Sequence, residues 1–69
     1  MNSITVTVNG SSTDLATVTT IEQLLVLLKL PERGVAIAVN REVVARSTWS
    51  SRILAGGDSI EVVSAAAGG

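Results

Sequence analysis

The sequence has 69 residues, a net charge of −1, no cysteine and no histidine. This length allows one small domain, and the composition excludes disulfides, thiolate metal sites and the side chains most suited to nucleophilic and acid–base catalysis near neutral pH. A net charge of −1 gives no electrostatic reason to expect nucleic-acid binding. The longest fully apolar run, residues 24–28, is too short to cross a bilayer. The first residues lack a signal-peptide pattern, so we expect a cytoplasmic protein without a membrane segment.

The chain begins with a pattern typical of a β-hairpin. Aliphatic residues and threonines alternate in the order Ile4, Thr5, Val6, Thr7 and Val8, which places the aliphatic side chains on one face of a strand. Asn9-Gly10 follows, a preferred pair for a two-residue turn that requires positive φ at both positions. The pattern then predicts a weaker second strand over residues 11–18, with Leu15, Ala16 and Val18 as its apolar positions.

A leucine-rich segment predicts the main helix, over residues 21–30. Thr19 with Glu22, or Thr20 with Gln23, has the spacing of a capping box at its start. The apolar stripe recurs with helical spacing at Ile21, Leu24, Leu25 and Leu28, and Leu27 and Leu30 widen it. Pro31 is expected to end the helix, and residues 31–34 lead out of it.

The second half of the chain predicts further strands. Val35, Ile37 and Val39 alternate with alanines, which indicates a strand over residues 35–39. A turn over residues 40–42, a short strand at Val43-Val44, a helical turn over residues 47–51 and a tight turn over residues 56–58 follow. The last predicted strand covers residues 59–64, with Ile60 and Val62 on one face.

The predicted order is therefore ββαβ(β)β, in the α+β class. One helix must bury its apolar stripe against one face of one sheet. A β-grasp, or ubiquitin-like roll, satisfies this order: a mixed sheet of four to five strands packed on one main helix. We expect residues 1–64 to form this domain and residues 65–69 to form a flexible tail.

That tail ends in Gly68-Gly69 after three alanines. Because glycine lacks a Cβ atom, a partner enzyme can enclose such a backbone in a narrow channel. Six extended residues span about 20 Å, so the terminal carboxylate can enter a buried site while the domain stays outside. A carboxylate becomes a good electrophile after ATP-dependent adenylation.

Taken with this tail, the second half of the chain resembles the ThiS family, the sulfur carriers of thiamine biosynthesis. The resemblance lies in residues 35–40, Val44, Arg46, Trp49, residues 57–63 and Gly68-Gly69. The first half agrees in pattern only. The chain departs from the family in two places: Ala45 stands where a proline is frequent, and Ala65-Ala66-Ala67 form a less varied approach to the glycines than is usual.

The resemblance implies a reaction cycle in which the chain is a protein co-substrate and not an enzyme. An E1-like adenylyltransferase would activate the Gly69 carboxylate with ATP, while Gly68 lets the tail thread into the enzyme. Sulfur from a source such as a cysteine desulfurase would then give a thiocarboxylate, which thiazole synthase consumes. No bound cofactor or metal is implied, because the partner enzyme uses the ATP.

Three further features have two interpretations each. Arg46 is interpreted either as a contact to a partner protein or as the ion-pair partner of Glu42. Trp49 is a partner contact or, as the single large side chain, a core residue, and we favour the core. Ala36, Ala38 and Val63 form an exposed apolar docking patch or are covered by the helix or by neighbouring strands.

Other functions fit the same pattern. A molybdopterin-synthase-type sulfur carrier shares the chemistry and the Gly-Gly end, but it usually lacks the spacing of Arg46 and Trp49. A ubiquitin-like protein modifier would form isopeptide bonds with lysines. A simple interaction module would have its terminal glycines by coincidence.

Overall fold

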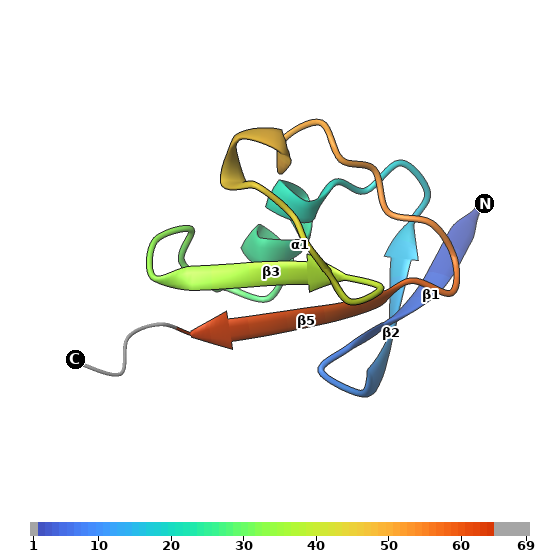
Figure 1. Ribbon diagram of the computed structural model, residues 1–69. Coiled ribbons are helices and arrows are strands. Elements are labelled where there is room, and N and C mark those ends of the chain that lie inside the picture. The colour runs from blue at the N-terminus through green and yellow to red at the C-terminus, as the bar shows by residue number, and fades with distance from the viewer. Residues whose placement is uncertain (1, 65–69) are drawn as a thin grey trace.

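The computed structural model describes residues 2–64. Its elements are β1 (Ser3–Val8), β2 (Ser11–Ala16), α1 (Ile21–Leu27), β3 (Val35–Val39), β4 (Glu42–Val43), the 3-10 helix η1 (Arg46–Thr48) and β5 (Ser59–Ser64). The five strands form one sheet in the order β2-β1-β5-β3-β4. β1 and β5 run parallel, while the other neighbouring strands run antiparallel. Figure 1 shows α1 packed on one face of this sheet, which confirms the predicted β-grasp arrangement.

The first hairpin has the predicted turn but a shorter second strand. Asn9 and Gly10 have φ values of 50° and 86°, as a two-residue hairpin turn requires. β2 ends at Ala16 and not at residue 18, because Val18 adopts a φ of 68° and turns the chain away. Ala16 and Val18 were therefore wrong as apolar anchors of this strand. Both are exposed, while Leu15 is buried as expected.

The helix begins as predicted and ends earlier. Thr20, and not Thr19, is the N-cap: its hydroxyl accepts from the Gln23 N–H at 3.2 Å, and the Gln23 side chain accepts from the Thr20 N–H at 3.0 Å. At the other end, the Lys29 N–H bonds the Val26 carbonyl and the Leu30 N–H bonds the Leu25 carbonyl. This is a Schellman motif.

Lys29 closes that motif in the left-handed region, with a φ of 59°. The helix thus ends at Leu27, before Pro31. Leu27 was expected to widen the apolar stripe, but it is 63% exposed. Leu30 does pack against the core, from the chain beyond the helix.

The second half follows the predicted pattern, except that β4 covers Glu42–Val43 and not Val43-Val44. Asn40 and Arg41 form a two-residue turn between β3 and β4, with φ values of 53° and 70°. The helical turn begins at Arg46, one residue before the predicted segment. Gly57 has a φ of 88° in the next turn, which the Asp58 N–H closes by bonding the Ala55 carbonyl at 3.1 Å. A residue with a Cβ would be strained at such a φ.

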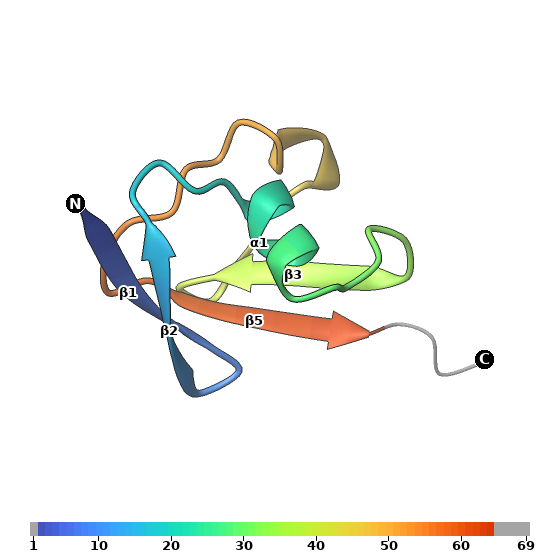
Figure 2. The same cartoon turned by 180° about the vertical axis from the view of Figure 1, so that it is seen from behind.

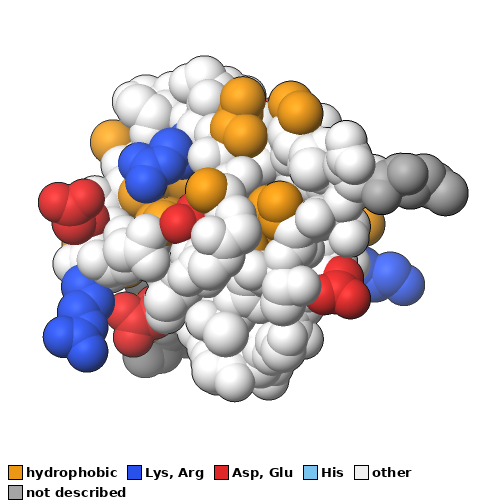
Figure 3. Space-filling model, turned by 90° about the vertical axis from the view of Figure 1, so that its right-hand side faces the viewer, with side chains coloured by type: hydrophobic (Ala, Val, Ile, Leu, Met, Phe, Trp, Pro, Cys, Tyr) orange, Lys and Arg blue, Asp and Glu red, His pale blue; other side chains and the backbone are white. Residues whose placement is uncertain are grey.

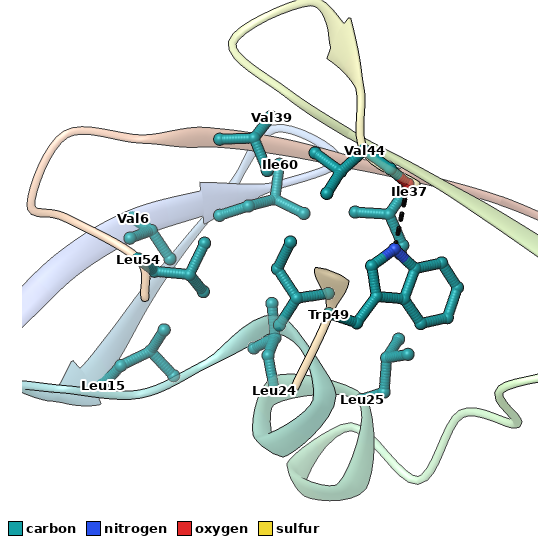
Figure 4. Packing of buried hydrophobic residues seen from close by; sticks show 11 residues of the cluster. Val6, Leu15, Leu24, Leu25, Ile37, Val39, Val44, Trp49, Leu54 and Ile60 are labelled. Carbon is teal, nitrogen blue, oxygen red and sulfur yellow. Dashed lines mark hydrogen bonds between the residues drawn. The ribbon is translucent and has the colours of Figure 1, made fainter. Parts of the chain in front are cut away.

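One apolar core lies between the sheet and the helix. Figure 4 shows its buried side chains converging from the strands, α1 and the loop before β5. Its members are Val6, Leu15, Ile21, Leu24, Leu25, Ile37, Val39, Val44, Trp49, Leu54 and Ile60. The four predicted stripe residues all contribute, with Leu28 partly buried at the edge. Figure 2 shows from behind that α1 crosses in front of β3, so this core closes one face of the sheet.

Candidate functional site

The candidate site is the C-terminal end of β5 together with the sheet surface around it. β5 is the central strand, held by β1 on one side and by β3 on the other. Its pairing with β3 runs from Val39–Ile60 to Val35–Ser64. In Figure 1 the end of β5 points away from the body, on the opposite side of the molecule from the start of β1. The last described residue of β5, Ser64, therefore lies at the edge of the described domain. Gly68 and Gly69, the predicted reactive end, lie outside the described residues.

An asparagine side chain reinforces β5 close to this end. The Asn9 Oδ1 accepts from the Val62 N–H at 2.8 Å, and the Asn9 Nδ2 donates to the Val62 carbonyl at 3.2 Å. The sequence marked Asn9 only as a turn residue. Its second role depends on a residue 53 positions away, which no local pattern reveals.

A second polar network fixes the turns at the start of β5. The Asp58 carboxylate accepts from the Ala55 N–H at 2.8 Å and from the Asn40 Nδ2 at 3.0 Å. The Asn40 Oδ1 in turn accepts from the Ser59 N–H at 2.9 Å. These bonds join the β3–β4 turn to the turn before β5. Asparagine side chains thus hold β5 at its first residue, Ser59, and again at Val62.

An apolar group lies exposed on the sheet face opposite α1. We call Ala36, Ala38, Val43 and Val63 the outer-face group. Val63 is paired with Ala36, and Val43 with Ala38, in the β registers. Val63 is 62% exposed and Val43 is 81% exposed, so the helix does not cover them. Of the three predicted residues, Ala36 and Val63 are exposed, as the patch interpretation expects, while Ala38 is half-buried. A docking role for the patch stays a prediction. Val43 was not among the predicted patch residues, although it lies in the short strand β4 and pairs there with Ala38.

The two remaining candidates differ in accessibility. Arg46 is exposed at the first residue of η1. Trp49 is 4% exposed, and its Nε1 donates to the Val44 carbonyl at 3.0 Å. Figure 4 shows this bond and the indole at the end of the core beside Leu25. The preferred interpretation of Trp49 as a core residue is confirmed.

The described surface shows no concave reaction site. Residues 2–64 contain no pocket and no group of three or more acidic side chains placed to hold a metal ion. In the same range, no helix has the length and hydropathy of a membrane span. Figure 3 looks onto the side where β1 begins: most of its surface is neither charged nor apolar, and it carries both acidic and basic side chains.

Known proteins share this fold and sequence pattern. The chain is 26% identical to the thiamine biosynthesis protein (ThiS) from Geobacter metallireducens, whose crystal structure it matches with a TM-score of 0.80. That match covers 88% of this chain and 93% of the other. The comparison with curated proteins returned no match. The model of the ThiS family matches residues 5–69, including the two terminal glycines. The protein therefore belongs to the ThiS family.

Proposed function

We propose that this protein is a sulfur carrier of thiamine biosynthesis, working in the cytoplasm. The observation that carries the proposal is the family match, which extends through Gly69. The composition supports it, because the chain has no cysteine side chain on which to hold sulfur. The fold supports it too: β5 is held through Ser59 and Val62 by asparagine side chains, and its last residue lies away from the start of β1.

In the proposed cycle the carrier supplies a carboxylate and the partner enzymes supply the catalysis. An E1-like adenylyltransferase joins the Gly69 carboxylate to AMP from ATP and releases pyrophosphate. The outer sulfur of a cysteine persulfide, made by a cysteine desulfurase, then attacks the acyl carbon, and AMP leaves with one carboxylate oxygen. A thiol reduces the resulting S–S bond and frees the thiocarboxylate. Thiazole synthase takes up this sulfur, so the carrier is a co-substrate and binds no cofactor of its own.

The outer-face group is the surface proposed to dock on these enzymes. Its apolar side chains lie on β3, β4 and β5, and Val43 and Val63 are exposed. β5 is the strand that leads to the reactive end. Apolar patches rimmed by polar residues are typical of interaction sites. Arg46, exposed on η1, is a second candidate contact, whereas the burial of Trp49 assigns it to the support of this region.

Intact-mass measurement tests the chemistry. The protein from its natural host, and the pure chain incubated with its adenylyltransferase, ATP and sulfur source, should both end at Gly69 with one oxygen replaced by sulfur. Gly69→Ala and Gly68→Ala should lower the adenylation rate because an added Cβ crowds the enclosed backbone. Ala67→Gly is the matched control and should retain the rate. A chain that continues past residue 69 without processing, or a wild-type end that is never adenylated, would contradict the proposal.

The acceptor of the sulfur distinguishes the alternatives. Rescue of a thiazole-requiring strain supports the thiamine pathway. Rescue of a molybdopterin-requiring strain instead would assign the same chemistry to the other carrier family. Ladders of larger conjugates in the natural host would indicate a protein modifier.

Charge substitutions test the docking surface. Val43→Glu and Val63→Glu should raise the KM of the adenylyltransferase for the carrier by about tenfold each, because a buried unpaired charge is costly at an interface. Leu27→Glu makes the same change at an equally exposed apolar position on α1 and should leave KM unchanged. If all three variants behave alike, the outer-face group is not the docking surface.

A further inference from the structure

The Asn9 side chain bonds β5 at the point where the backbone pairing of β1 with β5 ends. Backbone pairing of β1 with β5 runs through Thr7–Ser59 and Val8–Ile60. The Asn9 N–H adds one more bond, to the Ile60 carbonyl at 2.9 Å. The chain then turns away at Gly10, so β1 offers no further backbone to β5.

The Asn9 side chain continues this ladder for one more step. Its amide presents a carbonyl oxygen to the Val62 N–H and an NH₂ group to the Val62 carbonyl. A primary amide carries the same donor and acceptor as a peptide group, so it imitates the next backbone unit of β1. Asn9 alone thus makes three hydrogen bonds to the stretch of β5 that leads toward the C-terminal end.

The turn itself does not require these bonds. Glycine adopts the left-handed conformation of position 9 as readily as asparagine, and Gly-Gly is also a favoured pair in this turn type. The asparagine side chain therefore has a role separate from the shape of the hairpin. Both bonds to Val62 are exposed to solvent. Their loss would loosen β5 locally more than it would destabilise the whole domain.

We infer that Asn9 is a positioning residue for the activation of the C-terminus, a role that rests on the proposed carrier function. Its bonds to Val62, together with the pairing of β3 as far as Val35–Ser64, hold the last part of β5, to which the C-terminal segment is joined. A loosened strand end must be ordered again when the chain enters a partner enzyme. Ordering the backbone of one residue changes an equilibrium constant by about tenfold.

The effect on activation is expected to appear in binding. With the wild-type adenylyltransferase and ATP, Asn9→Gly should raise KM for the carrier about tenfold and leave kcat unchanged. The reason is that the variant differs from the wild-type carrier in the order of β5 only before docking. Asn9→Asp keeps an acceptor for the Val62 N–H and tolerates the left-handed conformation, so it should restore part of the lost affinity.

Hydrogen exchange tests the anchor without any partner. In Asn9→Gly the Val62 amide should exchange about tenfold faster, while the amides of Leu24 and Leu25 in α1 should be unchanged. Thr20→Ala is the control for general destabilisation, because it removes the helix cap, whose hydroxyl accepts its hydrogen bond from Gln23 in α1. It should leave both KM and the exchange of Val62 unchanged at temperatures where the protein is folded.

Two results would overturn the inference: unchanged exchange of Val62 in Asn9→Gly, or an equal rise in KM in Thr20→Ala. Failure of the proposed function looks different. In that case the wild-type chain itself is not adenylated, which also removes the role of Asn9 in activation, while the exchange measurement still shows whether the anchor exists.

Discussion

The indole nitrogen of Trp49 donates a hydrogen bond to the main-chain carbonyl of Val44, five residues earlier, at 3.0 Å. Both residues are buried, and they lie on either side of η1. The bond closes the segment from Val44 to Trp49, which contains η1, into a compact loop. One side chain thus fills the core and also satisfies the backbone beside it.

Replacing Trp49 by phenylalanine should separate these two contributions. Trp49→Phe keeps an aromatic ring in the core but removes the donor for the Val44 carbonyl, at a cost of about 1–3 kcal/mol in the free energy of unfolding. Trp49→Ala also leaves a cavity and should cost about 3–5 kcal/mol. Urea unfolding followed by circular dichroism measures both. Val26→Ala, at a position 70% exposed, should change little, and an equally small effect for Trp49→Phe would show that the hydrogen bond contributes nothing.

The Asp58 carboxylate accepts two hydrogen bonds that hold the turn before β5. Asp58→Ala removes both and should lower the free energy of unfolding by about 1–2 kcal/mol. Asp58→Asn retains one acceptor oxygen and should lose about half as much, since an amide cannot accept from both donors in this arrangement. Chemical unfolding measures the difference. Glu61→Ala, an exposed acidic residue in β5, is the control; a loss as large as that of Asp58→Ala would attribute the effect to charge alone.

Val18 has a φ of 68°, a conformation that β-branched residues rarely adopt. Its side chain is 66% exposed, so little packing would be lost on replacement. Val18→Asn should raise the free energy of unfolding by about 1 kcal/mol, because asparagine tolerates this region. The same change at Val26, which is similarly exposed but helical, should be neutral or destabilising. A lower Tm for Val18→Asn would show that the valine is not strained.

Lys29 occupies the position after the helix C-cap where glycine is most frequent. Lys29→Gly should therefore raise stability by up to about 1 kcal/mol and keep the Schellman hydrogen bonds. Differential scanning calorimetry would record a higher Tm. Gly34→Ala is the opposite test, because Gly34 has a φ of 76° and the added Cβ would be strained there. If both variants lower the Tm, the left-handed conformation at position 29 is not the source of strain.

Regular patterns of the sequence predicted most of the fold. Alternation placed Val6, Ile37 and Ile60 in the core, and Asn9-Gly10 located the hairpin turn. These features are local: period and turn chemistry determine them. The sequence limited the N-cap of the helix to two adjacent residues, because Thr19 and Thr20 each have a capping-box partner three residues later.

The differences arise where no local signal exists. Nothing in Thr17-Val18 marks a turn, since neither residue favours positive φ. The leucines continue past the helix, so periodicity alone extended it to residue 30, whereas the Leu30 N–H bonds the Leu25 carbonyl in a different geometry. The link between Asn9 and Val62 joins the two ends of the chain, and only the assembled sheet brings them together.

The position of β5 has a consequence for synthesis on the ribosome. Ile60 is paired with Val8 on one side and with Val39 on the other, so the strand made last is the one that joins the two halves of the sheet. Until β5 has left the exit tunnel, the first hairpin and the β3–β4 pair lack their common neighbour. The nascent chain therefore completes its sheet only after translation of that strand, and a truncated translation product lacks the neighbour that joins its halves.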